Sequence, residues 1–314
     1  MEIRADSTVD MGVDLTGLAL ANPVMTASGT FGYGVESKDL VDLAELGAVV
    51  TKGLSPVPKE GNRAPRIWEA QAGVINSIGL ENPGVDYFCE EYLPVLRSYD
   101  TRVVVNFFGQ TEQDYVVCAA TLDAADGVDA LEMNLSCPNV QAGGLQFGQD
   151  PSMAGRLVAA CRRATSKPLW AKLSLVGPVV EVARACVDAG ADVLCLGNTI
   201  PAMAIDPRTR RPRLGALTGG LSGPAIHPVA VRAVFVVHRA ELGVPLVGIG
   251  GIRTGLDAAE FLLAGASAVQ VGTQTLVEPN ACIRIRDELR AYCIEQKVTS
   301  VGQLRGACRL DGDA

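Results

Sequence analysis

The sequence predicts a closed barrel of eight parallel strands covered by helices, the (β/α)8 fold. Two observations support this prediction: eight short, apolar, β-rich runs recur along the 314 residues, and segments with helical periodicity lie between most of them. Such alternation of strands and helices is typical of a parallel sheet with helices packed on it. Eight strand–helix units within about 250 residues match the size of a (β/α)8 barrel.

The strands are expected where the apolar runs are richest in aliphatic residues. In chain order these runs are residues 23–28, 48–53, 102–109, 130–137, 169–174, 193–199, 245–251 and 268–273. Apolar residues recur with a helical period between them, which predicts helices over residues 114–125, 153–164, 178–189, 228–242 and 255–264. Glycine follows several of these helices, and it suits the left-handed position that ends a helix.

A doubly wound open sheet is the alternative architecture. It would normally carry a G-x-G-x-x-G motif after the first strand, whereas this chain reads SGTFGYG there. No linker, repeat or charge block divides the sequence, so we expect one domain over residues 1–314. Two insertions, about 54–99 and about 200–225, leave the C-terminal ends of the second and sixth predicted strands. Barrel enzymes build their active sites at that edge, so we expect both insertions to shape the site.

Composition excludes several classes of function. The formal net charge of −8 argues against a sequence-independent grip on nucleic acid or on an anionic membrane. The two histidines leave little material for a histidine-rich metal site or a Ser-His-Asp triad, and no metal is expected. The nine cysteines form no C-x-x-C pair, and most read as small buried hydrophobes. The N-terminus carries no apolar signal segment, so a cytoplasmic protein with reduced thiols is expected.

Polar side chains occupy the last positions of otherwise apolar strands. They are Ser28, Lys52, Asn106, Asn134, Lys172 and Asn198. A polar group there would be costly in a sealed core, whereas it suits a polar ligand at the mouth of a barrel. Lysine can stabilise negative charge that develops on a ring or a phosphate, although Schiff-base chemistry is a competing role.

Glycines follow the last two predicted strands, in GIGG (248–251) and VGT (271–273). This is the usual place for a phosphate in the fold, because bare backbone N–H groups can approach the anion. We therefore expect a phosphorylated cofactor or substrate. The fourth strand leads into NLSCPNV (134–140), where Cys137 is a candidate base or nucleophile at the same edge.

Several motifs together resemble the dihydroorotate dehydrogenase family. They are NPVMTASGTFGYG, NSIGLENPG, NLSCPNV, TGGLSGPAI, GIGGI and AVQVGT, in order from about residue 12 to residue 290. NLSCPNVQAGGLQFG and GNRAPRIWE are most similar to the class 1B catalytic subunit. The resemblance implies FMN at the barrel mouth and oxidation of (S)-dihydroorotate to orotate in pyrimidine synthesis.

The resemblance also implies roles for individual residues. Cys137 would be the catalytic base that takes the C5 proton while the C6 hydride passes to flavin N5, and Lys172 would stabilise the reduced ring. Substrate would be bound by Lys52, Asn76, Ser77, Ile78, Gly79, Leu80, Asn134, Asn139, Asn198 and Thr199. FMN would be contacted by Ser28, Lys52, Gly53, Asn106, Asn134, Lys172, Gly197, Gly223, Gly250, Gly251, Gly272 and Thr273.

The chain departs from the family pattern at two places. Leu175 and Val176 stand where the family usually has Pro and Asn, and Gly197 replaces a larger apolar residue, which predicts space beside the flavin ring. Class 1B enzymes form dimers that pair with a subunit carrying FAD and a [2Fe–2S] cluster, which passes electrons to NAD⁺. We therefore expect a homodimer within such a heterotetramer. A uracil- or thymine-reducing enzyme resembling dihydropyrimidine dehydrogenase and a fumarate-linked class 1A enzyme are the alternatives.

Overall fold

Eight parallel strands form the centre of the computed structural model, which describes residues 9–136 and 149–310. The strands follow one another in the order β3-β16-β15-β10-β9-β8-β7-β4. Their bounds are β3 Val24–Thr26, β4 Val49–Val50, β7 Val103–Phe107, β8 Ala130–Asn134, β9 Leu169–Leu173, β10 Val193–Leu196, β15 Leu246–Ile249 and β16 Ala268–Val271. The Thr26 amide donates to the Ala48 carbonyl (3.2 Å) and joins the two ends of the sheet. The predicted (β/α)8 barrel is confirmed, and the doubly wound alternative is excluded.

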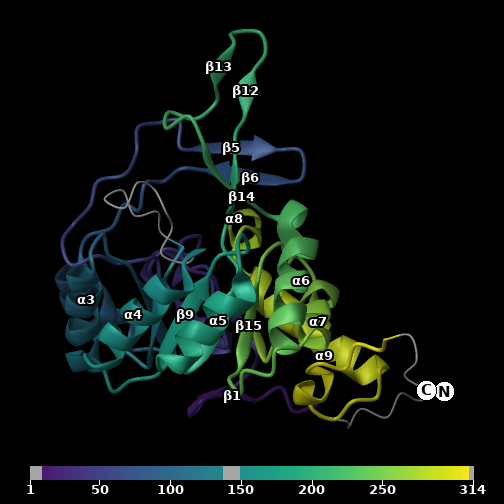
Figure 1. The fold of residues 1–314 in the computed structure, drawn as a ribbon. Helices are drawn as coiled ribbons and strands as arrows, with labels where there is room; N and C mark the ends of the chain where they lie inside the picture. Colours follow the sequence, from purple (N-terminus) through teal and green to yellow (C-terminus); the bar gives the residue numbers. More distant parts are fainter. Residues whose placement is uncertain (1–8, 137–148, 311–314) are drawn as a thin grey trace.

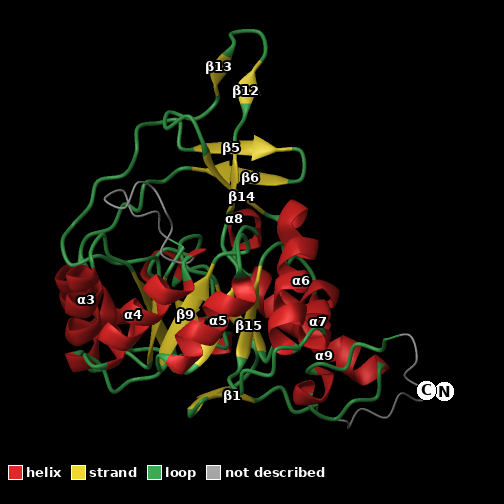
Figure 2. Ribbon diagram, in the orientation of Figure 1, coloured by secondary structure: helices red, strands yellow, loops and turns green. Residues whose placement is uncertain are grey.

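Helices pack around the outside of the barrel (Figure 2). Five of them were predicted: α3 Glu112–Ala124, α4 Pro151–Arg162, α5 Val179–Asp188, α6 His227–His238 and α7 Gly255–Leu263. Two more, α8 Gln274–Val277 and α9 Ala281–Glu295, follow the last strand. Helix α6 ends earlier than expected, because the chain turns at Glu241 and Gly243, both with positive φ. The capping boxes at Thr111 and Thr254 fix where α3 and α7 begin.

Alternation along the strands divides the barrel interior into layers. Side chains two residues apart share a face of a strand, so Ala130, Glu132 and Asn134 on β8 point the same way, as do Trp170 and Lys172 on β9. The lower interior is apolar and includes Met25, Val50, Val104, Ala130, Trp170, Val193 and Val247. Above it lies a buried polar layer that contains Asn106, Glu132, Lys172 and Gln270.

The bottom of the barrel is covered by a short antiparallel hairpin. Its strands are β1 Val13–Leu15 and β2 Leu18–Leu20, with Leu15 paired to Leu18. Leu15, Leu18 and Leu20 belong to the same buried cluster as the lower interior of the barrel. The hairpin therefore seals the end of the barrel opposite the C-terminal strand ends (Figure 1).

The two insertions meet in one antiparallel sheet beyond the C-terminal ends of the strands (Figure 1). The first supplies β5 Ile67–Ala70 and β6 Gly73–Asn76, and the second supplies β11 Ile200–Ala202 and β14 Gly219–Ser222. Their order is β11-β14-β6-β5, so β14 of one insertion pairs with β6 of the other. The sequence predicted both insertions but not this pairing, because nothing in either segment identifies the other as its partner.

The remaining elements are short and belong mostly to the insertions and connections. The second insertion projects a hairpin, β12 Ile205–Asp206 with β13 Arg211–Pro212, and the first continues into α1 Val85–Tyr87, the π-helical turn η3 Phe88–Tyr92 and α2 Leu93–Leu96. Single 3-10 turns are η1 Val35–Ser37, η2 Leu43–Glu45, η5 Pro224–Ile226 and η6 Val301–Leu304. In the described part of the chain, no helix has the length and apolarity to cross a membrane.

The cysteines other than Cys137 are mostly packing residues, as predicted. Those that are buried are Cys118, Cys161, Cys186, Cys195, Cys282 and Cys293. Burial raises the pKa of the Cys186 and Cys282 thiols to about 12, so both stay protonated at neutral pH. Cys89 is half-buried, and the prediction is wrong for Cys308, which is exposed. It lies in the coil after η6.

The junction of the two insertions can be tested at Gly73. A Cβ atom at this position would lie 2.0 Å from the Ser222 carbonyl oxygen on the paired strand β14. Gly73→Ala is therefore expected to cost roughly 1–3 kcal/mol by overpacking and to make residues 200–222 more sensitive to limited proteolysis. Gly302→Ala is the matched control, because its Cβ would approach nothing closer than 3.6 Å. Equal proteolysis of the two variants would contradict the pairing.

Candidate functional site

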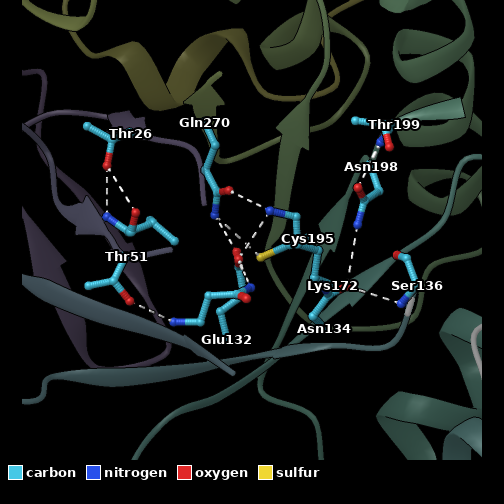
Figure 3. Close-up of polar contacts among 12 residues, drawn as sticks. Thr26, Thr51, Glu132, Asn134, Ser136, Lys172, Cys195, Asn198, Thr199 and Gln270 are labelled. Atoms are coloured by element: carbon cyan, nitrogen blue, oxygen red, sulfur yellow. Dashed lines mark hydrogen bonds and ion pairs between the residues drawn. The ribbon is translucent and has the colours of Figure 1, made fainter. Parts of the chain in front are cut away.

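Strand order and register bring the predicted polar residues to one end of the barrel. Asn134 and Lys172 are paired across β8 and β9, and Asn106 is paired with Glu132 across β7 and β8. Asn198, just past β10, donates from Nδ2 to Asn134 Oδ1 (3.3 Å; Figure 3). Ser28 and Lys52 follow β3 and β4, the two neighbours that close the barrel. The six residues thus share the same edge, as the sequence predicted.

A buried polar network fills the barrel below this edge (Figure 3). The Glu132 carboxylate accepts hydrogen bonds from Asn106 Nδ2 at 2.7 Å and from Lys172 Nζ at 3.2 Å, both at Oε1. Its other oxygen accepts from Gln270 Nε2, and the Gln270 carbonyl in turn accepts from Lys172 Nζ (3.5 Å). Strands β7, β8, β9 and β16 each contribute one side chain, so the network ties opposite sides of the barrel together.

Two members of the network, Glu132 and Gln270, are functional candidates that the sequence analysis missed. Both lie inside runs that were interpreted as apolar strands, ALEMNLSC and AVQVGT. A charged residue in the middle of a buried strand is costly unless it is paired. Glu132 and Lys172 both lie at strand positions whose side chains point into the barrel. Two oppositely charged residues at such interior positions were the signal in the sequence that could have identified the pair.

The electrostatics of the network are those of a buried ion pair. Glu132 is fully buried and Lys172 is 4% exposed. Removing one partner of such a pair leaves an uncompensated charge in the interior and is strongly destabilising. Cys195 lies beside it, with Sγ 4.0 Å from Gln270 Nε2, and burial and the Glu132 charge raise the pKa of its thiol well above the usual range. The thiol is therefore a neutral neighbour of the pair.

One atom of the network has no hydrogen-bond partner among the described residues. Asn106 is fully buried, and its Oδ1 accepts no hydrogen bond from this part of the chain. A Cβ atom built on Gly53 would lie 2.8 Å from Asn106 Oδ1, so this oxygen is directed at the backbone after β4. A buried acceptor without a donor is costly, and a ligand with a polar ring or ribityl chain would satisfy it.

The predicted phosphate-binding glycines come together next to the mouth. Gly223 and Gly251 both have positive φ, and a Cβ on Gly251 would lie 2.8 Å from the Gly223 carbonyl oxygen. Thr273 donates from Oγ1 to Ser222 Oγ (2.8 Å), which links the end of β16 to the end of β14. Gly272 has a negative φ, and its Cβ would make only an ordinary 3.5 Å contact. These loops form a cradle in which backbone N–H groups can approach an anion.

A histidine lies behind the cradle and supports it. His227 Nδ1 lies 3.1 Å from the Gly250 carbonyl oxygen, and its Nε2 lies 3.2 Å from Glu260 Oε2. Together with Asp257, these side chains are close enough to bind a metal ion. Asp257, however, already accepts two backbone N–H groups as the cap of α7. The observed contacts therefore explain the cluster as a support for the Gly250 turn.

Gly197 lies too close to the neighbouring strand to carry a side chain, and space beside a flavin ring at this position stays a prediction. A Cβ atom at Gly197 would lie 2.0 Å from the Ile249 carbonyl oxygen of the neighbouring strand. The backbone there has φ of 151°, a conformation that favours glycine. Glycine is needed because the chain passes close to β15, so the departure from the family pattern reflects backbone packing.

The first insertion carries the predicted substrate residues Asn76 to Leu80. Asn76 lies on β6 and donates from Nδ2 to the Gly220 carbonyl oxygen (3.3 Å). The Ser77 amide donates to the Arg66 carbonyl oxygen, and the Ile78 carbonyl oxygen accepts from the Asn62 amide. These bonds hold the turn at Gly79 and Leu80, both of which have positive φ. In the second insertion, the Thr199 amide donates to Asn198 Oδ1 (2.8 Å).

Cys137 and Asn139 lie outside the described residues. The segment that leads to them is anchored as far as Ser136: the Tyr115 hydroxyl donates to the Asn134 carbonyl (2.8 Å), and the Ser136 amide donates to Asn134 Oδ1 (3.2 Å). Asn134 therefore has three contacts in the site through its side chain and its backbone, with Asn198, Ser136 and Tyr115.

The fold and the site define a (β/α)8 barrel with a buried Lys–Glu pair beneath a glycine-lined cradle. The family model described as "Dihydroorotate dehydrogenase" matches residues 11–292. The chain belongs to the dihydroorotate dehydrogenase family.

Relatives similar over nearly the full length support this assignment. The chain is 55% identical over 299 residues to "Dihydroorotate dehydrogenase B (NAD(+)), catalytic subunit" of Pelobacter propionicus, covering 95% of this chain and 98% of that protein. It is 52% identical over 302 residues to the protein of that name from Geobacter sulfurreducens, covering 96% and 99%. A crystal structure of DHODH in complex with ferulenol from Eimeria tenella shares the fold, with a TM-score of 0.80 at 24% identity, covering 97% and 89% of the two chains.

Because the space around Gly197 and Gly272 differs, alanine at these two positions is expected to change the free energy of unfolding by very different amounts. Gly197→Ala places a Cβ against the β15 backbone and is expected to cost about 1–3 kcal/mol or more of the free energy of unfolding. Gly272→Ala adds only an ordinary contact and should change it by less than about 0.5 kcal/mol. Denaturant unfolding of the cofactor-free protein measures both. If Gly272→Ala proved as destabilising as Gly197→Ala, Gly272 would be a packing glycine, and its place in an open cradle would be wrong.

Proposed function

We propose that this protein binds FMN at the barrel mouth and oxidises (S)-dihydroorotate to orotate as the catalytic subunit of an NAD⁺-linked enzyme. Membership of the dihydroorotate dehydrogenase family and the names of the similar full-length proteins support this activity. The observation that carries it in this chain is the buried Lys172 ammonium, which Glu132 holds on the strand beside the predicted substrate residue Asn134, itself bonded to Asn198.

The described residues fit FMN in three places. The cradle of Gly223, Gly251 and Gly272 would hold the phosphate, because its backbone N–H groups suit an anion. Asn106 Oδ1, a buried acceptor that has no partner in the described part of the chain, would receive a donor from the cofactor. Lys172 would stand against the part of the ring that gains negative charge. Ser28, Lys52, Gly53, Asn134, Gly197, Gly250 and Thr273 complete the proposed contacts.

The chain's own residues would bind and orient the substrate. Amides both donate and accept, so Asn76, Asn134, Asn139 and Asn198 suit the ring amides of dihydroorotate. Lys52 and the N–H groups near Gly79 would receive its carboxylate, assisted by Ser77, Ile78, Leu80 and Thr199. Cys137 would take the C5 proton as the base, and FMN, when bound, supplies the two-electron oxidant. Exclusion of water by the two insertions would favour proton transfer to the thiolate.

A partner subunit is the second part of the proposal. The similar proteins are named as NAD(+) enzymes and as catalytic subunits. The chain has neither the cysteine spacing of an iron–sulfur cluster nor a dinucleotide fingerprint after its first strand. We propose that a second subunit with FAD and a [2Fe–2S] cluster carries electrons to NAD⁺, and that the assembly is a heterotetramer built on a dimer of this chain. A cytoplasmic location is part of the same proposal.

The domain organisation proposed from the sequence follows from the same site. Residues 1–314 would act as one FMN-binding unit, with the insertions at about 54–99 and 200–225 covering the mouth. Support comes from the pairing of β6 with β14, which joins the two insertions into one sheet at the C-terminal ends of the barrel strands.

The half-reaction can be tested directly on the purified chain loaded with FMN. Anaerobic addition of dihydroorotate should bleach the flavin absorption band, whereas dihydrouracil should not, because it lacks the carboxylate that Lys52 would bind. Bleaching by dihydrouracil alone would instead support the enzyme resembling dihydropyrimidine dehydrogenase. An unchanged spectrum with both compounds would refute the proposed activity.

The base can be tested by Cys137→Ala. Removal of one catalytic base typically lowers the rate by about 10²–10⁴-fold, and FMN content should stay at the wild-type level. The measurement is the rate of flavin bleaching in single turnover, with Cys308→Ala as the control because its thiol is exposed and lies far along the chain from the site. A bleaching rate close to wild type in Cys137→Ala would show that another group takes the proton.

The electron acceptor distinguishes the class of enzyme. We expect the isolated, FMN-loaded chain to reduce an artificial dye with electrons from dihydroorotate but to leave NAD⁺ unchanged until the partner subunit is added. Steady-state assays with dye, NAD⁺ and fumarate measure this. Rapid turnover with fumarate would indicate a class 1A enzyme, and reduction of NAD⁺ by the isolated chain would remove the need for a partner.

A further inference from the structure

We propose that Glu132 is a positioning residue of this site: its carboxylate holds the Lys172 ammonium in place and, by compensating its charge, sets the redox potential of the bound flavin. The inference rests on the proposed function, since it concerns the group that Lys172 would face. It assigns a role in the reaction to a side chain that lies one layer below the substrate residue Asn134 on β8.

The contacts of Glu132 show why a carboxylate is required. Within residues 9–136 and 149–310, the three side chains that hydrogen-bond to it are all donors: Asn106 Nδ2 and Lys172 Nζ at Oε1, and Gln270 Nε2 at Oε2. An ionised carboxylate is an acceptor only, whereas an amide offers one acceptor oxygen and one donor group. Glutamine at this position would therefore place a donor against Gln270 Nε2 and leave Lys172 without a counter-charge. The site therefore requires a negatively charged group at position 132, and an amide of the same shape does not replace it.

Burial strengthens the electrostatic interaction between Glu132 and Lys172. Glu132 is fully buried and Lys172 nearly so, so water does little to screen their interaction. Asn106 and Gln270 each contact the carboxylate from another strand, which fixes its position relative to the barrel. The register places Lys172 beside Asn134, one step below the mouth. The Glu132 carboxylate thus binds the Lys172 ammonium and partly compensates its positive charge. The interaction of Lys172 with a ligand at the mouth is weaker as a result.

The consequence for the flavin follows from charge balance. Reduction adds negative charge to the ring, and a nearby ammonium favours that change while a nearby carboxylate opposes it. With both present, the net charge of the pair is zero, and the flavin potential is lower than Lys172 alone would make it. Removing the Glu132 charge while keeping Lys172 should therefore raise the midpoint potential.

The first experiment uses the cofactor-free protein and is independent of the activity. Thermal unfolding is compared for wild type, Glu132→Gln, Lys172→Met and the double variant. If the two charges compensate each other, each single variant lowers the melting temperature, and the double variant melts above both. Additive losses in the double variant would show that Glu132 and Lys172 stabilise the barrel separately, and would overturn the inference.

The second experiment measures the midpoint potential of FMN in the loaded protein. Glu132→Gln should favour the reduced form at least tenfold, which is a rise of about 30 mV for a two-electron couple. Thr26→Val is the matched control, because it removes a buried hydrogen bond to Val50 on the barrel without changing charge. Its potential should equal that of wild type. A potential of Glu132→Gln that is unchanged or lower would contradict the proposed role.

The two experiments separate this inference from the proposed function. If wild type binds FMN and is bleached by dihydroorotate but Glu132→Gln leaves the potential unchanged, the function stands and the role of Glu132 falls. If wild type binds no FMN, the function falls, and the unfolding comparison still decides whether the two charges are coupled. If Glu132→Gln alone fails to retain FMN, the role of Glu132 in setting the potential of the bound flavin falls, and the unfolding comparison still decides whether its charge holds Lys172.

Discussion

The ion pair between Lys172 and Glu132 is the interaction on which the upper half of the barrel depends. Two charges this deeply buried persist only if each satisfies the other and the remaining hydrogen-bonding atoms find partners. Asn106 supplies such a partner from the neighbouring strand β7, and Gln270 supplies one from β16 across the barrel. The pair and these two partners thus join four strands and separate the apolar floor around Trp170 from the polar mouth around Asn134. Burial of the two charges costs desolvation free energy, and a role of Lys172 in binding a ligand at the mouth explains why the pair is present.

Barrel closure brings the remaining parts of the site to the same place. Because all eight strands run parallel, their C-terminal ends form one ring, and loops from distant parts of the sequence meet there. The glycine turns after β14, β15 and β16 build one side of the mouth. The two insertions cover it from above, through the pairing of Gly220 with Asn76 across β14 and β6. The closed parallel barrel therefore explains why the glycine cradle, the amides of Asn134 and Asn198 and the sheet of the two insertions lie at the same end of the fold.

The sequence was sufficient for features that arise from local periodicity and composition. All eight strands, five of the helices and the edge that carries Asn134, Lys172 and Asn198 follow from alternation and apolar runs. It was insufficient where distant segments had to be combined. Glu132 and Gln270 become partners only when β8 and β16 face each other across the barrel. The β6–β14 pairing and the contact of Gly197 with the Ile249 backbone depend in the same way on three-dimensional proximity.

A crystal structure of the chain with FMN and orotate would test the central claim most directly. We predict that the phosphate lies among Gly223, Gly251 and Gly272, that Lys172 contacts the flavin ring while still paired with Glu132, and that orotate lies between the ring and the amides of Asn134 and Asn198. A flavin bound elsewhere on the barrel, or a Lys172 side chain that contacts neither the ring nor Glu132, would contradict it.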